Sequence, residues 1–390
     1  MKKLLSLALA LLMLAVMLPV VSMADEIKWE EDKNVYWQAG NKSAQTATLA
    51  EALKAAYMAN NGDITITCRP DSDVGSLTHG HVADNITIIG NGAYISGGEC
   101  DLEVDTYMFS RDTGSQVESG GAYLDKDITI TASNLYNLGV WGERHTDYTV
   151  NINLTNCDSK EISGKGNVQR VYITGTTGVN NITVTGCNFL TKATALYSNA
   201  DGTVVIDNCT FKGGQVPVNF NHKADGKQTV AVKNSTFTNC GDEGEWSAFA
   251  APVRFVNSGK GSLNATIENN TFTGTVGNNG DILLGDYREG KESHDVTATI
   301  TPNGTTKVRN SGITDEPTPI TGKVTADAKG NITPVKEEGP SQIVIISPTQ
   351  DTPKTDDQKN PTTGANDLVA VAVAAAALAL AGSAIILRKD

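Results

Sequence analysis

One short pattern recurs along this chain and constrains its fold more than any other feature. Two aliphatic residues stand two positions apart, and a small residue and a large apolar residue follow them. The clearest copy is Ile182, Val184, Cys187 and Phe189. Further copies begin at Val204, Val230, Ala265, Ile128 and Ile152, with looser ones at Ile64, Ile86 and Ala298. Because the intervals are irregular and never shorter than 22 residues, we expect a fixed coil that carries loops of variable length.

Each copy alternates apolar and polar residues, which is typical of a strand with one buried face. Inside each copy stands a residue that adopts a positive φ angle at low cost, where we expect the chain to bend. These residues are Asn156, Gly186, Asn208, Asn234 and Asn269. A second strand is expected later in each coil, at 140–141, 171–173, 196–197, 218–220, 253–255 and 282–284. One coil cannot bury its own apolar face, so the coils must stack.

The end of such a stack exposes apolar core and unpaired strand edges, and the sequence predicts a cover for it. A helix is expected near 48–59, where Thr48 and Glu51 have the spacing of a capping box. The order of this helix, the segment GDITI at 62–66 and the repeated coils resembles the right-handed parallel β-helix proteins of the pectin-lyase-like class. The segment NITIIGNGA at 85–93 is similar to that class too. The resemblance implies an all-β solenoid of about nine coils within residues 25–312.

The first 24 residues have the pattern of a secretory signal peptide. Lys2 and Lys3 precede an apolar run, and small residues at Ser22 and Ala24 predict cleavage after Ala24. The export that this segment predicts would place the rest of the chain outside the cytoplasm.

Residues 360–390 have three parts: NPTTG at 360–364, an apolar segment at 368–387 that is long enough for a transmembrane helix, and a basic tail at 388–389. This tail resembles the cell-wall sorting signal of Gram-positive surface proteins. The resemblance implies that sortase cuts between Thr363 and Gly364 and that Thr363 is joined to peptidoglycan. The family pattern begins with Leu where this chain has Asn360, which leaves the sortase class open. A single-pass membrane anchor is the alternative, with the same region outside the cell.

Residues 313–359 are rich in Pro, Thr, Lys and Asp, so we expect a stalk between the folded body and the anchor. A Lys-Gly-Asn turn at 329–331 predicts one hairpin at 323–334 within this stalk. The formal net charge of the chain is -13. Because nucleic-acid binding needs basic surfaces, we exclude nucleic acid as a partner.

The six cysteines of an exported chain could form three disulfides. However, Cys157, Cys187 and Cys209 hold the same inward position in successive coils. Side chains stacked in this way point in parallel directions, and their Cβ atoms lie farther apart than the two Cβ atoms of a disulfide. We therefore expect buried free thiols.

The second strands predict an outward row that could bind a ligand. Its outward positions are expected to be Trp141, Tyr172, Leu196, Asn219, Arg254 and Leu283. Aromatic faces beside charged groups can hold sugar rings while the sugar hydroxyls form hydrogen bonds. The candidate ligand-binding residues in this row and in the turns beyond it are Trp141, Arg144, His145, Tyr172, Asn219, His222, Arg254, Asp286 and Arg288. Alternatively, Trp141 and Tyr172 pack under a loop and the charges belong to solvated turns.

The pectin-lyase-like class includes lyases, which use clustered Asp residues to bind Ca²⁺, and hydrolases, which use two or three carboxylates on adjacent coils. The polygalacturonase motifs of that class do not occur in the expected body, and His79-Gly80-His81 is only a partial match. We expect a non-catalytic surface protein for adhesion or glycan binding, with no cofactor; no motif indicates Ca²⁺. The alternatives are a wall-anchored polysaccharide lyase or glycoside hydrolase, and an architectural surface-layer component.

Overall fold

The computed structural model describes residues 27–59, 62–77, 81–82, 84–96, 100–104, 126–143, 146–160, 169–242, 249–285, 295–310 and 316–335. These residues form an all-β structure with one helix, α2 (Leu49–Ala59). The expected signal peptide 1–24 and the expected sorting signal 360–390, with Ala24, Thr363 and Gly364, lie outside the described residues. No helix in the described part is long and apolar enough to cross a membrane, and the expected segment 368–387 lies outside that part.

The strands form three sheets, which we name the long, second and short sheets. In sheet order, the 13 strands of the long sheet are β2 (Lys42–Thr46), β1 (Val35–Ala39), β3 (Ile64–Cys68), β5 (Ile86–Ile89), β7 (Ile128–Ser133), β9 (Thr149–Thr155), β11 (Val179–Thr185), β14 (Gly202–Asp207), β17 (Lys227–Lys233), β20 (Ser262–Glu268), β23 (Val296–Thr301), β26 (Val324–Asp327) and β27 (Ile332–Pro334). The 10 strands of the second sheet are β25 (Thr318–Ile320), β24 (Thr306–Asn310), β22 (Ile282–Leu284), β19 (Val253–Asn257), β16 (Val218–His222), β13 (Leu196–Ser198), β10 (Arg170–Thr174), β8 (Gly139–Glu143), β6 (Asp101–Val104) and β4 (His81–Val82). The four strands of the short sheet are β12 (Asn188–Leu190), β15 (Thr210–Lys212), β18 (Thr236–Thr238) and β21 (Thr271–Thr273).

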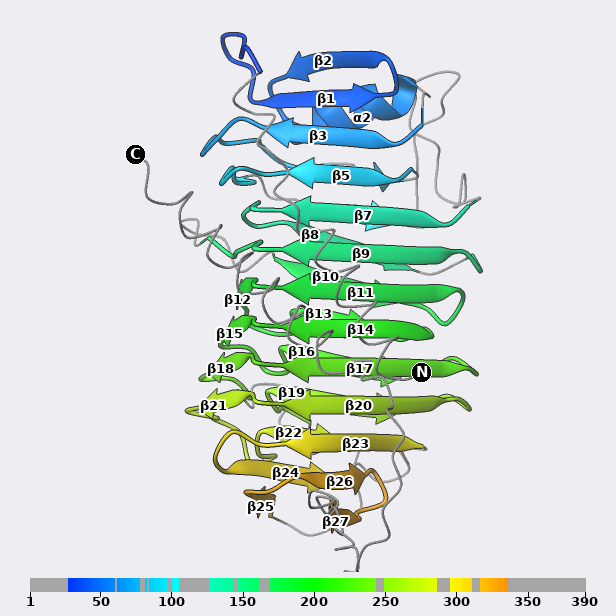
Figure 1. Cartoon of the computed structure of the whole chain (residues 1–390), viewed down its shortest axis with the longest axis vertical. Helices are drawn as coiled ribbons and strands as arrows, with labels where there is room; N and C mark the ends of the chain where they lie inside the picture. Colours follow the sequence, from blue (N-terminus) through cyan, green and yellow to red (C-terminus); the bar gives the residue numbers. More distant parts are fainter. Residues whose placement is uncertain are drawn as a thin grey trace, which may run out of the picture. The chain divides into compact units, whose positions relative to one another are not determined.

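Successive strands of each sheet come from successive passages of the chain. From β3 to β23 every neighbouring pair in the long sheet is parallel, and Figure 1 shows these strands stacked one beyond the next. Between two passages through the long sheet, the chain contributes a strand to the second sheet. Long parallel sheets with this strand order are consistent with a β-helix or solenoid.

Equivalent residues of successive repeats lie opposite one another in the long sheet. Ile182 pairs with Val204, and Val184 pairs with Ile206. The same register continues at Val230, Val232, Ala265, Ile267, Ala298 and Ile300. These side chains are buried in one continuous core. The alignment expected from the sequence over this region is confirmed.

The register between β7 and β9 differs from the expected one by two residues. Ile130 pairs with Ile152, and Ala132 pairs with Leu154, whereas the repeat pattern places Ile130 opposite Leu154. A shift of two residues keeps the same side chains on the buried face, so alternation alone cannot distinguish the two registers. The bend distinguishes them, because Asn134, with a φ of 50°, takes the place of the Asn or Gly in the later coils.

The expected bends all have positive φ angles. The value is 51° at Asn156, 64° at Gly186, 53° at Asn208, 50° at Asn234 and 54° at Asn269. Each bend follows a long-sheet strand, and in several coils a short-sheet strand comes next. Asn and Gly are the residues that adopt this conformation at the lowest cost, so the repeat is placed by backbone geometry as well as by core packing.

Large side chains stack on their equivalents inside the coils. Phe189, Phe211, Phe237 and Phe272 form one ladder, with neighbouring ring centroids 5.0, 4.8 and 5.0 Å apart. The parallel register places each ring directly against the next. Offset-stacked aromatic pairs stabilise a fold beyond the area that they bury.

The inward position after the bend satisfies backbone donors of the preceding coil. The N–H of Cys157 donates to Cys187 Sγ at 3.3 Å, and the N–H of Cys209 donates to Ser235 Oγ at 3.1 Å. The N–H of Ser235 in turn donates to Asn270 Oδ1 at 2.9 Å. A small side chain with an acceptor atom is therefore favoured at this position, which explains why Cys, Ser and Asn recur there.

All six cysteines are buried and free, which agrees with the expectation for Cys157, Cys187 and Cys209 and extends it to the other three. Burial raises the pKa of Cys68 to about 12 and that of Cys209 to about 11. Burial also raises the pKa of Cys240 to about 12. At neutral pH these thiols stay protonated, and the thiolate is the nucleophile in alkylation and disulfide exchange.

Both ends of the stack are covered by antiparallel strands. At the first end, β1 pairs antiparallel with β3 and β2, and α2 buries Leu49 and Leu53 in the core. The expected capping box is confirmed, since the N–H of Glu51 donates to Thr48 Oγ1 at 3.2 Å and the N–H of Thr48 donates to Glu51 Oε2 at 3.4 Å. This cover satisfies strand edges that would otherwise be open.

At the other end, residues that we expected in the stalk belong to the sheets. The hairpin expected at 323–334 consists of β26 and β27, but β26 also pairs antiparallel with β23, and β25 pairs antiparallel with β24. The stalk therefore cannot begin at residue 313. The outermost strands β25 and β27 contain Pro319 and Pro334, and proline suits an edge because it has no N–H to offer a further strand.

We predict that Gly186→Ala lowers the free energy of unfolding by about 1–3 kcal/mol. Gly186 has a φ of 64°, and a Cβ atom there would lie 2.4 Å from Asn156 Oδ1. The matched control is Asn208→Gly at the next bend, which should change stability by less than about 1 kcal/mol. Urea unfolding measures both, and equal stability of wild type and Gly186→Ala would contradict the bend.

We also predict that the native protein resists alkylation by iodoacetamide at pH 8, whereas the denatured, unreduced protein exposes six reactive thiols. Mass spectrometry after each treatment counts the labels. Disulfide-linked peptides, or rapid labelling of the native protein, would contradict the buried thiols.

Candidate functional site

Five side chains on consecutive strands of the second sheet, from β8 to β19, lie in one register column, and we call these five the outward row. Trp141 pairs with Tyr172, and Tyr172 pairs with Tyr197. The column then continues to Asn219 and Arg254. The structure thus brings together four of the residues that the sequence singled out: Trp141, Tyr172, Asn219 and Arg254.

Leu196 is not in the outward row. It pairs with Val171 on the inner face and is fully buried. β13 contains only three residues, so the sequence offers little alternation from which to judge its facing. Tyr197 occupies the outward position instead. Leu283 follows Arg254 in register, but its side chain is buried too.

The aromatic half of the row is partly packed against itself. The rings of Tyr172 and Tyr197 are stacked, with centroids 4.6 Å apart and an angle of 13° between them. Tyr197 is 9 % exposed, and burial raises its pKa to about 12. Trp141 and Tyr172 are half-buried. The accessible aromatic surface of the row is therefore at Trp141 and Tyr172.

The polar half of the row forms a packed cluster. Arg254 donates to Asn219 Oδ1 at 3.0 Å, and its guanidinium lies 4.8 Å from the ring centroid of Phe249. Arg254 and Asn219 are each only 5 % exposed. Their contacts hold two adjacent strands together, so we assign them a structural role that supports the row.

An ion pair borders the accessible end of the row. Arg170 and Asp101 each pair in register with Gly139 from opposite sides. Because Gly139 has no side chain, Arg170 reaches across it: its Nε and Nη2 atoms donate to Asp101 Oδ1 and Oδ2 at 3.2 and 2.5 Å. The hydrogen bond to Asp101 raises the pKa of Arg170. The sequence pattern gives no signal for this pair.

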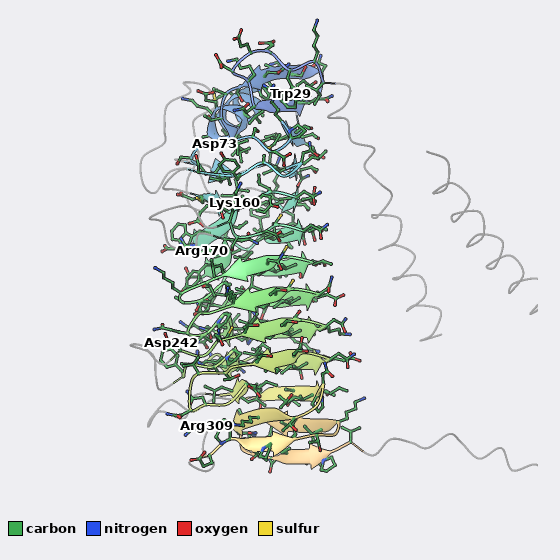
Figure 2. All side chains as sticks on the ribbon, turned by 90° about the vertical axis from the view of Figure 1, so that its left-hand side faces the viewer. Trp29, Asp73, Lys160, Arg170, Asp242 and Arg309 are labelled. Atoms are coloured by element: carbon green, nitrogen blue, oxygen red, sulfur yellow. The ribbon has the colours of Figure 1, made fainter. Side chains whose placement is uncertain are left out.

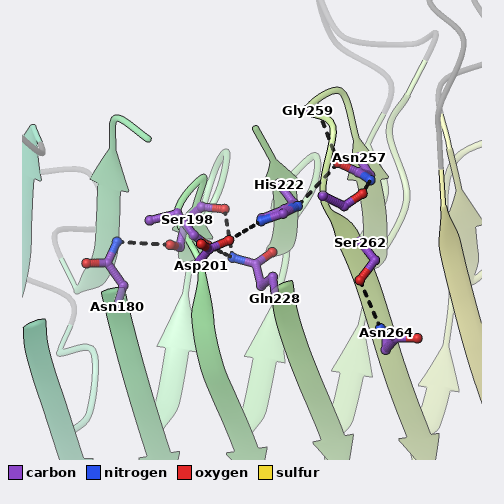
Figure 3. Close-up of polar contacts among 11 residues, drawn as sticks. Asn180, Ser198, Asp201, His222, Gln228, Asn257, Gly259, Ser262 and Asn264 are labelled. Carbon is purple, nitrogen blue, oxygen red and sulfur yellow. Dashed lines mark hydrogen bonds and ion pairs between the residues drawn. The ribbon is translucent and has the colours of Figure 1, made fainter. Parts of the chain in front are cut away.

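His222 lies on the inner face, away from the outward row. Its side chain is 0 % exposed, since β16 continues the alternation of Val218 and Phe220 to residue 222. Nε2 lies 2.7 Å from Asp201 Oδ1, and Nδ1 lies 3.3 Å from Asn257 Oδ1 (Figure 3). The Nδ2 of Asn257 donates to the carbonyl of Gly261 at 2.5 Å, which fixes the orientation of the amide.

Other buried polar groups lie near His222 and form hydrogen bonds of their own (Figure 3). Asn180 Nδ2 donates to Ser198 Oγ at 3.1 Å, and Gln228 Nε2 donates to the carbonyl of Ala200 at 2.9 Å. These groups join the ends of second-sheet strands to the starts of long-sheet strands. Buried polar groups that are paired in this way specify the corner of the coil.

Four of the expected ligand-binding residues, Arg144, His145, Asp286 and Arg288, lie outside the described residues. Within the described ranges, no three His, Cys, Asp or Glu side chains gather in a group that could hold a metal ion.

Comparison of the chain with protein-family models finds no match. Comparison with curated proteins and with solved structures finds none either.

We predict that His222→Ala lowers the free energy of unfolding by about 2–4 kcal/mol, because it leaves Asp201 and Asn257 without their buried partner. The control is Lys223→Ala at the neighbouring exposed position, which should change stability by less than about 0.5 kcal/mol. Urea unfolding of both variants measures the effect. A His222→Ala variant of unchanged stability would contradict the structural role of this ring.

Proposed function

We propose that this chain is a non-catalytic surface protein that is exported, anchored to the cell wall and binds glycans through the accessible end of its outward row. The stacked sheets are, in this proposal, a right-handed parallel β-helix of the pectin-lyase-like class. The single observation that carries the binding proposal is the pairing of Trp141 with Tyr172 on adjacent strands, with the Arg170–Asp101 ion pair at their border.

The chemistry of these four side chains suits a sugar. A sugar ring packs its CH surface against an aromatic side chain, and its hydroxyls need donors and acceptors at the edge of that contact. Arg170 and Asp101 supply both, and their side chains are 42 % and 22 % exposed. The parallel ladder holds all four on rigid strands, which lowers the entropy that binding costs.

The anchoring part of the proposal depends on the two ends of the sequence. The signal peptide 1–24 directs export, and NPTTG at 360–364, the apolar segment and the basic tail fit a sortase substrate. The membrane holds the chain before sorting, and peptidoglycan holds it afterwards. The part of 313–359 that follows the sheets serves as a spacer between the body and the wall.

We predict saturable binding of the purified full chain to at least one acidic or neutral glycan, with and without Ca²⁺, measured by calorimetry. Trp141→Ala should weaken it about tenfold or more, because Trp141 is one of the two half-buried aromatic residues of the row. Tyr148→Ala is the matched control, since Tyr148 is an exposed aromatic residue before β9 and outside the row. Its affinity should equal that of wild type.

The same titration distinguishes the alternatives. New absorbance of unsaturated sugars, or new reducing ends, would replace the binding proposal with a lyase or a glycosidase. Binding that Trp141→Ala leaves unchanged would remove the outward row as the site. Absence of binding to every glycan would favour an architectural role.

A further inference from the structure

A second column of outward side chains lies at the bend that follows the long sheet. It extends the register of the short sheet into coils that have no short-sheet strand. Isolated parallel bridges join Asp73 to Tyr94, Tyr94 to Tyr136, Tyr136 to Asp158 and Asp158 to Asn188. We call this set the tyrosine column. Two tyrosines on adjacent coils thus have a carboxylate on the coil before them and another on the coil after.

Backbone hydrogen bonds hold the tyrosine column rigidly. The N–H of Tyr94 donates to the carbonyl of Ser72 at 2.9 Å, and the N–H of Tyr136 donates to the carbonyl of Ala93 at 3.0 Å. Both tyrosine side chains are half-buried, so part of each ring stays accessible.

A cation already occupies this aromatic surface. Lys160 Nζ lies 4.1 Å from the ring centroid of Tyr94 and 5.7 Å from that of Tyr136. Figure 2 shows Lys160 on the same side of the stacked coils as Asp73. An ammonium group within about 6 Å of a ring centroid is attracted by the negative face of the ring.

The position of Lys160 over the rings is informative because a carboxylate, that of Asp158, is close to it in the chain. Asp158 is two residues away, yet no ion pair joins it to Lys160 among the described residues. Asp158 Oδ1 instead accepts from the N–H and Nδ2 of Asn188, at 3.1 and 2.8 Å. Asp73 Oδ1 accepts from the N–H of Gly75 at 2.9 Å. Each carboxylate keeps a second oxygen that can face a cation at the rings.

We propose that the tyrosine column is a binding site for an organic ammonium ion, and that Lys160 occupies it until such a ligand displaces the side chain. The two ring faces attract the cation, and Asp73 and Asp158 add negative charge on both sides. A quaternary ammonium group fits best, because aromatic rings recognise it through cation–π attraction, whereas the Lys ammonium is strongly hydrated.

The site shares no residue with the proposed glycan site at Trp141, Tyr172, Arg170 and Asp101. Displacing Lys160 costs the ligand one cation–π contact. An exposed contact of this type corresponds to about a two- to fivefold change in affinity. Removing Lys160 should therefore strengthen binding by that factor.

The test is a titration of the purified full chain with tetramethylammonium chloride, followed by saturation-transfer NMR on its methyl protons, with sodium chloride at equal ionic strength as the reference. We expect saturable transfer for wild type and about two- to fivefold tighter binding for Lys160→Ala. Lys212→Ala, at an exposed lysine of β15, should bind as wild type does.

The tyrosine variants decide the location. Tyr94→Leu combined with Tyr136→Leu should abolish the transfer, Tyr94→Phe should retain it because the ring remains, and Trp141→Ala should leave it unchanged. Thermal unfolding of each variant shows whether the fold persists. Transfer that survives loss of both rings, or an affinity that Lys160→Ala does not change, would overturn the proposal.

Discussion

The backbone hydrogen bonds between successive parallel strands are the interaction on which the rest of this structure depends. They place each residue of one coil opposite the equivalent residue of the next, about 4.8 Å away. Like side chains then stack, as Phe189 does on Phe211 in the core. The ladder also requires that every coil bend at the same place, which is why Asn or Gly with a positive φ follows the strands of the long sheet.

The same ladder produces the surface features with which we associate function. Outward side chains stack as inward ones do, so aromatic residues that are far apart in the chain become neighbours on the surface. Tyr172 and Tyr197 lie side by side in the outward row, and Tyr94 and Tyr136 lie side by side in the tyrosine column. Rigid strands hold both sets, whereas the loops between strands vary in length without disturbing the ladder.

The sequence predicts the ladder well where several kinds of residue agree. From Ile182 onward, aliphatic pairs, a bend residue and mostly Phe recur together, and the register was predicted correctly. Around Ile130 the whole pattern also fits at Ile128, Ile130, Ser133 and Leu135, two residues out of the observed register, because a slip of two residues keeps the alternation. The inward facing of His222 was readable from its spacing to Phe220. The Arg170–Asp101 pair was not predictable, because its partners are 69 residues apart and meet only once the register across Gly139 is known.

The most direct test of the account is the spacing of coils along the long sheet. Thr131, Thr266 and Thr299 are outward residues of one column of this sheet, and spin labels introduced there as cysteines react selectively because the native thiols are buried. Pulsed electron paramagnetic resonance should give separations of about 24 Å from residue 131 to 266 and about 29 Å from residue 131 to 299, one strand spacing apart. Separations that do not increase by one strand spacing would contradict the stacked parallel coils.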